Sequence, residues 1–425
     1  MTHLPHILLV NVFFAPFSYG GATIVAEQVA RALLEKGIAR TTAVSLISRP
    51  ELSPYSVIRS QVSGIDNYLI NVPAARSYEH FYDNPHMGSV IDSLISDLSP
   101  DLMHMHCIQE MGAEILRSAK RARLPVILSV HDYWWICERQ FMVRPDQVFC
   151  AQNPVLIDAC KSCVGNFAAA KSRFETLQNA ASLADVVTYP SHFARNLCEA
   201  SGLAPGLGVV WENGANLPRS DFRAKRSARR KADPRLVFGY VGGPSSIKGW
   251  PQIREAFRGL ARSDFSVHVV DGSLDSTWWA GHDFSKLSGD WTVVPRYQQS
   301  NMDDFYAGID VLLFMSQWKE TFGLTIREAM ARGIKVIQTD SGGTIEHEAV
   351  DHAHLISIGA SPEVLRRQII EVLDNHKPAV DQPQVHVTSF AEQALAFQSI
   401  MEQVLRQNRK HGGTHDQRTQ LPETT

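Results

Sequence analysis

Two glutamates, Glu320 and Glu328, lie eight residues apart around the start of an expected helix. A short apolar run before the first glutamate reads as a buried strand, while the residues after Gly323 have helical spacing. Unpaired amides at a helix start favour anions, so the amides of Phe322, Gly323 and Leu324 are suited to a diphosphate. Carboxylates on either side of such a site do not bind phosphate; they accept hydrogen bonds from hydroxyl groups, which sugars supply. The spacing therefore indicates a site for a sugar carried on a diphosphate.

Two glycine-containing loops follow expected strands elsewhere in the chain. Gly20 and Gly21 come after the first apolar run, and their amides can approach a diphosphate or an acceptor closely because no side chain intervenes. A second loop follows the apolar run 236–241 and contains Gly243 and Lys248. Each loop leads into a helix, and this order of strand, glycine loop and helix is typical of the opening of a doubly wound domain.

His131 follows the apolar run 126–130, so it is expected at the carboxyl edge of a parallel sheet, where ligands of such sheets bind. Asp132 beside it is suited to orienting a loop. His104 and His106 end another expected strand, and we assign them a mainly structural role.

Four of the six cysteines, namely Cys137, Cys150, Cys160 and Cys163, fall within 27 residues in an apparent insertion. The C-x2-C spacing of the last pair is typical of a metal ligand set, and the segment is suited to shaping the acceptor pocket. A structural Zn²⁺ and four reduced thiols both stay open. Disulfides are less favoured because the chain starts without an export signal.

Short apolar runs alternate with helical patterns along most of the chain, which predicts parallel strands buried on both faces. The expected strands are 6–12, 43–47, 102–105, 126–130 and 186–189 in a first series, and 236–241, 267–270, 291–294, 311–314 and 335–338 in a second. The expected helices are 88–98, 112–121, 250–260, 302–307, 324–332, 362–374 and 390–406, with another that begins near Val25. The predicted fold class is α/β, with two doubly wound Rossmann-like domains that face each other across a cleft.

A strongly basic segment, 219–235, separates the two series and contains eight Lys and Arg residues against two Asp. Phe222 is its only large apolar residue, so we expect an exposed connector, and we favour this over contact with an anionic membrane. The expected parts are an N-terminal acceptor-binding domain (1–216), the linker (217–235), a C-terminal nucleotide-sugar-binding domain (236–386), a helix returning to the N-terminal domain (387–409) and a disordered tail (410–425).

The segment from Glu320 to Glu328 resembles the E-x7-E motif of the family-four retaining glycosyltransferases with the GT-B fold. The strand and glycine turn at 336–346 resemble the next part of that family, and the resemblance extends from about residue 6 to about residue 407. In the family the first glutamate contacts the transferred sugar and the second contacts the nucleotide ribose. By position these roles fall to Glu320 and Glu328.

Other residues are matched in the same way. Lys248 resembles the family lysine that neutralises charge on the leaving diphosphate, whereas Gly243 stands where the family usually has arginine, so loop amides or Arg327 would have to compensate. His131 resembles the active-site histidine that contacts the donor sugar. The resemblance gives a catalytic set of Glu320, His131 and Lys248, and a donor-binding set of Gly20, Gly21, Gly243, Arg296, Tyr297, Thr321, Phe322, Gly323, Leu324 and Glu328.

The reaction that the resemblance implies is retaining transfer of a sugar from a nucleoside diphosphate sugar to a glycan or lipid-linked acceptor. The acceptor hydroxyl would enter on the face from which the diphosphate leaves, and a diphosphate oxygen would take the proton. Double displacement on Glu320 is the less favoured alternative. No D-x-D pair occurs in the sequence, so we expect catalysis without a metal cofactor.

Composition sets further limits. The 44% of apolar residues excludes extended disorder, and the net charge of −3 disfavours nucleic acid as a partner. No apolar run reaches about 18 residues, so we expect a cytoplasmic enzyme. The family suggests polysaccharide or lipopolysaccharide synthesis at the inner membrane, and the aromatic loop from Phe13 to Phe17 is compatible with peripheral membrane contact.

Three other classes stay open as alternatives. A sugar-nucleotide epimerase, or another GT-B enzyme without transfer, is disfavoured by the two glutamates. A nicotinamide-dependent oxidoreductase is disfavoured because the first glycine loop lacks G-x-G-x-x-G. A non-catalytic sugar-nucleotide binder would differ only in chemistry, which release of nucleoside diphosphate by a Glu320→Ala variant would reveal.

Overall fold

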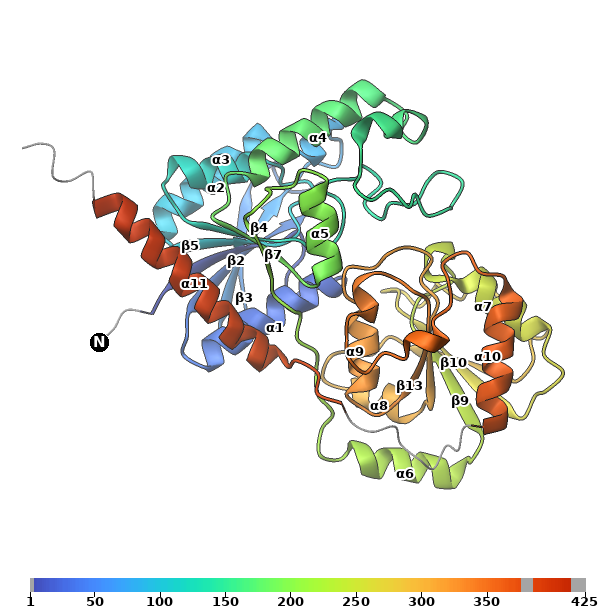
Figure 1. Cartoon of the computed structure of the whole chain (residues 1–425). Coiled ribbons are helices and arrows are strands. Elements are labelled where there is room, and N and C mark those ends of the chain that lie inside the picture. Colours follow the sequence, from blue (N-terminus) through green and yellow to red (C-terminus); the bar gives the residue numbers. More distant parts are fainter. Residues whose placement is uncertain (1–3, 376–384, 414–425) are drawn as a thin grey trace, which may run out of the picture. The chain divides into compact units, whose positions relative to one another are not determined.

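The computed structural model describes residues 4–375 and 385–413. The chain forms two compact units (Figure 1). The N-terminal unit contains Met1–Gln140, Gln152–Asn213 and Phe390–Thr425, and the C-terminal unit contains Phe141–Ala151 and Gly214–Ser389. Both are α/β units built on a largely parallel sheet, which confirms the prediction of two Rossmann-like α/β domains.

The N-terminal unit is built on an eight-stranded sheet in the order β3-β4-β2-β1-β5-β6-β7-β8. Its strands are β1 (His6–Val10), β2 (Arg40–Ile47), β3 (Val57–Val62), β4 (Ile65–Asn71), β5 (Leu102–Met105), β6 (Val126–Ser129), β7 (Val186–Tyr189) and β8 (Gly208–Val210). All neighbours are parallel except β3 and β4. The central strands are buried throughout, as their continuous apolar sequences predict.

The β3–β4 hairpin was missing from the predicted elements. Its strands pair antiparallel, with Val62 opposite Ile65, so Ser63 and Gly64 form a two-residue turn with φ of 53° and 77°. Positive φ at both positions is typical of the tight turns that join twisted strands. The dipeptide Ser-Gly between two β-branched segments is the signal that would have located it.

Helices cover both faces of this sheet. They are α1 (Gly21–Glu35), α2 (Pro85–Leu98), α3 (Glu114–Arg121), α4 (Phe167–Ala181), α5 (His192–Ala200) and α11 (Phe390–Gly413), with short 3₁₀ turns at Glu79–Phe81 and Ile157–Ser162. The helix α3 packs against α2 and α4, while α1 packs against α11, and Figure 1 shows these two groups on opposite sides of the sheet. The buried ring of Phe397 on α11 stacks on His104, and Trp211 donates from its indole to the carbonyl of Gln393 at 3.0 Å.

The C-terminal unit is built on a five-stranded parallel sheet in the order β11-β10-β9-β12-β13. Its strands are β9 (Leu236–Tyr240), β10 (Phe265–Asp271), β11 (Asp290–Pro295), β12 (Val311–Phe314) and β13 (Lys335–Gln338). Its helices are α6 (Phe222–Ala232), α7 (Trp250–Arg258), α8 (Met302–Ala307), α9 (Leu324–Met330) and α10 (Pro362–Asn375), with 3₁₀ turns at Ser246–Lys248, Gly343–Ile345 and His352–His354. One apolar cluster joins α7 and α10 to one sheet face, and a second joins α6, α8 and α9 to the other.

Most of the segment 219–235 is exposed, as expected, but it contains the helix α6, and three of its arginines are buried or partly buried. The helix α6 packs against α8, and the carboxylate of Asp310, which is fully buried, lies 2.6 Å from Arg229 and 3.2 Å from Arg230. Arg226 is 2% exposed and lies 3.8 Å from the same carboxylate. Because a buried carboxylate needs positive partners, Arg226, Arg229 and Arg230 turn toward Asp310, whereas most other residues of this helix face solvent.

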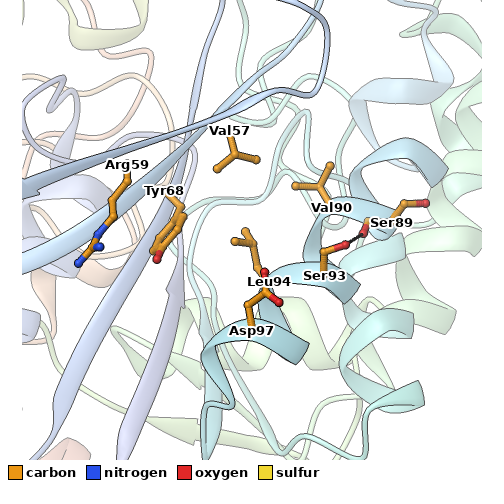
Figure 2. A pocket seen from close by; sticks show the side chains of 8 residues that line it. All are labelled: Val57, Arg59, Tyr68, Ser89, Val90, Ser93, Leu94 and Asp97. Atoms are coloured by element: carbon orange, nitrogen blue, oxygen red, sulfur yellow. Dashed lines mark hydrogen bonds between the residues drawn. The ribbon is translucent and has the colours of Figure 1, made fainter.

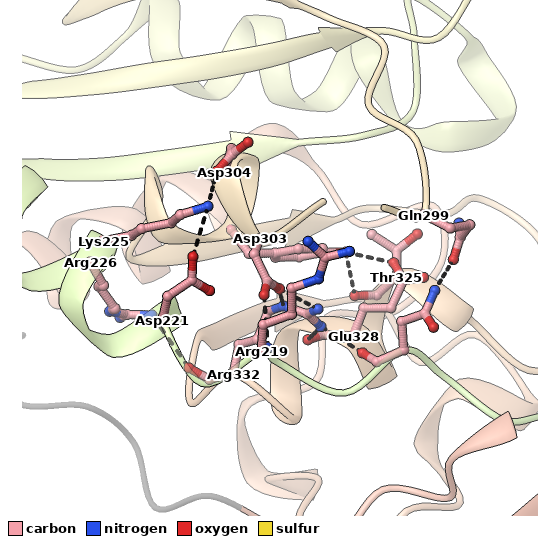
Figure 3. Close-up of polar contacts among 12 residues, drawn as sticks. Arg219, Asp221, Lys225, Arg226, Gln299, Asp303, Asp304, Thr325, Glu328 and Arg332 are labelled. Carbon is pink, nitrogen blue, oxygen red and sulfur yellow. Dashed lines mark hydrogen bonds and ion pairs between the residues drawn. The ribbon is translucent and has the colours of Figure 1, made fainter. Parts of the chain in front are cut away.

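The outer side of α6 carries an exposed ion pair as well. Lys225 lies 2.7 Å from Asp304 and 3.3 Å from Asp221 (Figure 3).

Within 4–375 and 385–413, no helix is both long enough and apolar enough to span a membrane. The predicted disordered tail, 410–425, lies mostly outside the described residues.

Candidate functional site

The strand order of the C-terminal unit places a topological switch point between β9 and β12. From β9 the chain continues to β10 and β11 on one side of the sheet, then crosses to β12 and β13 on the other. Ligands of open parallel sheets bind outside the carboxyl ends of the strands at such a point. Here the two loops at that position are 241–249 and 315–323, which contain Lys248 and Glu320.

The two loops are held together by backbone contacts. The amide of Gln317 donates to the carbonyl of Ile247 at 2.7 Å. Gly249 has φ of 82°, and a Cβ atom there would lie 2.0 Å from the carbonyl oxygen of Met315. Only glycine fits this position, because it tolerates both the left-handed conformation and the close approach of the second backbone.

Lys248 and Glu320 form an ion pair across the two loops. The Nζ of Lys248 donates to the Oε1 of Glu320 at 2.6 Å, and the hydroxyl of Ser316 donates to the same oxygen at 2.6 Å. The Lys248 side chain is 35% exposed and that of Glu320 is 10% exposed. The ammonium also lies 5.5 Å from the centre of the Trp318 ring. A cation and an oriented carboxylate therefore lie side by side at the switch point.

The backbone of Glu320 is fixed by the glycine turn after β13. The amide of Gly343 donates to the carbonyl of Glu320 at 2.9 Å, and Glu320 forms a parallel bridge with Gly342. Lys319 donates to the carbonyl of Asp340 at 2.7 Å. The loop that carries Glu320 thus docks on the next strand, which limits the conformational freedom of its carboxylate.

Glu328 lies inside α9 and is buried. Its Oε2 accepts a hydrogen bond of 2.8 Å from the hydroxyl of Tyr306, and Arg332 donates to its carbonyl at 3.0 Å (Figure 3). Burial raises the pKa of the Glu328 carboxyl above its ordinary value, and the Tyr306 hydroxyl opposes this. Arg332 is held in turn by Asp303, at 2.8 Å and 2.5 Å. Glu328 is therefore a carboxylate with a fixed orientation.

The predicted nucleobase residues follow β11. Tyr297 stacks on Phe305 with 5.2 Å between ring centres, and it lies 6.1 Å from the ring of Tyr306, which donates to Glu328. Burial raises the pKa of the Tyr297 phenol. Arg296 beside it is exposed. Tyr297 and Glu328 thus belong to one aromatic and carboxylate cluster, which sequence distance alone did not reveal.

The segment from Thr321 to Leu324 leads into α9, which is two residues shorter than the predicted helix. The Phe322 ring is buried and lies 4.9 Å from the guanidinium carbon of Arg327. Arg327 is 1% exposed and donates to the carbonyls of Thr344 and Gly343 at 3.0 Å and 3.4 Å. It therefore fixes the glycine turn, and the idea that it compensates for the missing arginine at position 243 is not supported.

Gly243 itself has no room for a side chain. Its φ is 63°, and a Cβ atom there would lie 2.6 Å from the ring of Trp278. The same ring lies 2.6 Å from the Cβ position of Gly272, in the loop after β10. Trp278 therefore fills the space beside both loops. The Trp-Trp pair at 278–279, in the segment after β10, is the sequence feature that would have located it.

The other predicted site residues belong to the N-terminal unit. His131 follows β6 and is partly buried, and its Nε2 lies 2.8 Å from the Nδ1 of His106, which follows β5. His104 lies next to His106, with 4.1 Å between ring centres, and its Nε2 contacts the hydroxyl of Ser129 at 2.8 Å. Burial lowers the pKa of His131 to about 4 and that of His104 to about 3. All three histidines are thus neutral at pH 7.

Asp132 fixes the loop after His131, as predicted from its position. It accepts hydrogen bonds from the amide of Trp134 at 2.8 Å and from the side chain of Gln140 at 2.6 Å. Gly20 and Gly21 stand where α1 begins, after a loop in which Phe13 and Tyr19 pack edge to face. Both aromatic rings and that of Phe17 are exposed.

The four clustered cysteines do not assemble into a metal site in this structure. Among the residues that the structure describes, no three His, Cys, Asp or Glu side chains are arranged to hold a metal ion. Cys150 belongs to the C-terminal unit, whereas Cys137, Cys160 and Cys163 belong to the N-terminal unit. Zinc binding by these residues stays a prediction.

A groove of about 530 Å³ lies between the β3–β4 hairpin and α2 in the N-terminal unit (Figure 2). It is lined by Val57, Arg59, Tyr68, Ser89, Val90, Ser93, Leu94 and Asp97. Arg59 is already paired with Asp66 at 2.8 Å. None of the lining residues was predicted to take part in chemistry.

Comparison with known protein families gives two matches that together span most of the chain. Residues 19–219 match the family described as Glycosyltransferase Family 4, and residues 221–384 match Glycosyl transferases group 1. The boundary between the two matches falls just before α6.

Individual relatives are distant. An uncharacterized 42.6 kDa protein from the cps region of Klebsiella pneumoniae is 21% identical over 360 residues, which cover 80% of this chain and 87% of that protein. The sucrose-phosphate synthase of Thermosynechococcus elongatus superposes with a TM-score of 0.62 at 16% identity, over 96% of this chain and 98% of that one. Anabaena HepE, solved with UDP and glucose, gives a TM-score of 0.58 at 16% identity, over 98% of this chain and all of that one.

Proposed function

Since this chain belongs to the family-four-type glycosyltransferases with the GT-B fold, we propose that it is a retaining enzyme that transfers a sugar from a nucleoside diphosphate sugar. The observation that carries this proposal is the ion pair of Lys248 and Glu320 at the switch point, eight residues before the oriented Glu328. Lys248 is suited to binding a phosphate, and the carboxylates of Glu320 and Glu328 are suited to binding hydroxyl groups.

In the proposed donor complex Lys248 neutralises the charge that develops on the leaving diphosphate. The amides from Thr321 to Leu324 and of Gly243 add hydrogen-bond donors to the same group. Glu320 accepts hydrogen bonds from hydroxyls of the transferred sugar. Loss of one hydrogen-bond donor to the charged group of a preorganised site typically lowers kcat by about 10²- to 10³-fold.

The nucleoside is proposed to bind at the cluster around Glu328. Its carboxylate accepts from the ribose hydroxyls, and Tyr297 and Arg296 lie where the loop after β11 would meet the base. HepE was solved with UDP and with UDP-glucose, which supports a uridine nucleotide as the first donor to test.

The N-terminal unit is proposed to bind the acceptor and to contribute Gly20, Gly21 and His131 to the donor site. The acceptor hydroxyl attacks on the face from which the diphosphate leaves, and a diphosphate oxygen takes its proton. In this scheme the protein supplies positioning and charge stabilisation, and it needs no metal cofactor for the chemistry because Lys248 supplies the positive charge.

The biological setting is proposed to be synthesis of a cell-surface polysaccharide or lipopolysaccharide at the cytoplasmic face of the membrane. The relative from a cps region supports a polysaccharide. Exposed Phe13, Phe17 and Tyr19 are suited to contact with a lipid-linked acceptor or a membrane surface. The basic helix α6 adds less to such contact than its composition suggested, because several of its cations are paired with aspartates.

A thermal-shift panel of UDP-, GDP-, ADP- and dTDP-sugars tests the donor site. A ligand at 100 times its Kd stabilises the folded state by about 2.7 kcal/mol, which corresponds to several degrees in Tm. The variant Lys248→Met should lose most of this shift, and Lys225→Met, whose ammonium lies in an exposed ion pair, should keep it. If no nucleotide sugar raises the Tm of the native protein, the proposed donor site is wrong.

Transfer itself is tested with the donor that the panel selects. Glu320→Ala should abolish release of nucleoside diphosphate in the presence of an acceptor extract. The anomeric configuration of the product, read by NMR, then decides between retention and inversion. An epimerised nucleotide sugar without release of nucleoside diphosphate would favour the epimerase class instead.

A further inference from the structure

The imidazole rings of His106 and His131 contact each other through their ring nitrogens at the carboxyl edge of the N-terminal sheet. His106 and His131 follow β5 and β6, which are parallel neighbours. The Nδ1 of His106 lies 2.8 Å from the Nε2 of His131, and the two ring planes are 11° apart. His106 is 1% exposed, whereas His131 is only partly buried. His106 is therefore the buried partner of His131, the histidine that the proposed site uses.

Proton positions in this pair are constrained. Both imidazoles are neutral at pH 7, because burial holds the pKa of His131 at about 4 and that of His106 well below its ordinary value. A neutral imidazole has one N–H donor and one acceptor nitrogen. A contact of 2.8 Å between two nitrogens therefore contains one proton, and the donor is either His106 or His131.

The two arrangements differ in what they bury. If His131 donated from Nε2, then His106 would carry its own proton on Nε2, and this nitrogen is buried without a hydrogen-bond partner. Buried N–H groups without an acceptor are rarer in proteins than unsatisfied acceptors, because an unmade donor loses its hydration without replacement. If His106 donates from Nδ1 instead, its buried Nε2 carries no proton, so His106 has no N–H without an acceptor.

We propose that His106 is a positioning residue for His131: it donates from Nδ1 to the Nε2 of His131 and so holds the proton of His131 on Nδ1. This inference rests on the proposed function only for the role of His131 in the donor site. It deepens that role, because it fixes which ring nitrogen of His131 carries the proton and hence that this nitrogen acts as a hydrogen-bond donor. His131 does not offer that nitrogen as a base.

The tautomer is measured directly on the full chain labelled with ¹⁵N-histidine, without any substrate. Loss of signals in His131→Asn assigns the His131 ring nitrogens. The expected spectrum has a protonated Nδ1 and an unprotonated Nε2 for His131. The variant His106→Asn keeps an amide donor near the former Nδ1 position and should retain this pattern. His106→Leu removes the donor and should shift His131 towards the Nε2–H form.

Ser129→Ala is the matched control, because it removes the contact to His104 in the same cluster and leaves the pair of His106 and His131 intact. It should not change the His131 tautomer. A wild-type spectrum with the Nε2–H form would overturn the proposal, as would an unchanged His131 signal in His106→Leu. If His106→Leu does not fold, the wild-type and His106→Asn spectra still decide. Since no step uses a donor sugar, failure of the proposed function would leave this result standing.

Discussion

The ion pair of Lys248 and Glu320 lends itself to a double-mutant cycle. The variants are Lys248→Met, Glu320→Gln and the double variant, which remove each charge with little change in volume. If the 2.6 Å contact is a favourable interaction, the losses in free energy of unfolding of the two single variants add up to more than the loss of the double variant. The coupling energy isolates the interaction from the effect of each substitution alone.

Its magnitude follows from distance and exposure. Two unit charges 4 Å apart attract by about 4 kcal/mol at an effective dielectric constant of 20, before any cost of desolvation or side-chain entropy. Exposed pairs retain about 0.2–1 kcal/mol of this, while breaking a fully buried pair costs about 3–5 kcal/mol. Glu320 is 10% exposed and Lys248 is 35% exposed, so we expect a coupling of about 1–3 kcal/mol.

Urea unfolding of the four proteins gives the coupling energy. A second cycle on Lys225 and Asp304, whose side chains are 41% and 62% exposed, serves as the control and should give no more than about 1 kcal/mol. A coupling below about 0.5 kcal/mol for Lys248 and Glu320 would refute the reasoning. Repeating the cycle with a saturating donor should reduce the coupling, because the diphosphate and the sugar hydroxyls would then compete for the two side chains.

Three further outcomes are expected. Asp310→Ala should cost about 3–5 kcal/mol in urea unfolding, because it leaves buried arginine charge without a partner; a loss below 1 kcal/mol would show that the helix arginines are not held this way. Tyr306→Phe should destabilise the protein by about 1–3 kcal/mol, since buried Glu328 loses its donor, and an equal stability would mean that water replaces the hydroxyl. Below pH 6.5 the unfolded chain binds a proton on His131 that the folded chain does not bind until about pH 4, so the free energy of unfolding should decrease as the pH is lowered from 6.5 to 4. The variant His131→Asn should reduce the slope of this dependence by about one proton. An unchanged slope would contradict the low pKa of His131.

Much of the fold was accessible from the sequence because its strands are buried on both faces. The run at 311–314 is β12 as predicted, and β5, β7 and β13 also have the predicted bounds. The hairpin β3–β4 was missed because one face of β3 is exposed and its residues are mixed in polarity. Propensity within a strand says little when packing is only on one side.

The helix α6 was also not predicted, but for a different reason. A segment with eight cations is expected to be solvated, and most of it is exposed, but the buried partner of three of its arginines, Asp310, lies about 80 positions away. The same limit applies at the candidate site. The eight-residue spacing indicated Glu320 and Glu328, but Tyr306 and His106, which contact Glu328 and His131, lie on α8 and after β5. Partners of this kind are decided by topology, and no local pattern encodes them.

The way α11 completes the N-terminal unit has a consequence for biosynthesis. Phe397 stacks on His104, yet the rest of that unit is synthesised by residue 213. At about 5–20 residues per second, the ribosome needs roughly 10–40 s to add the intervening chain and reach α11. During this interval the apolar surface under α11 and the histidine cluster lack their cover, while the C-terminal unit is already being made. The nascent N-terminal unit is therefore a natural client for chaperones, and truncation before Phe390 would leave it permanently in that state.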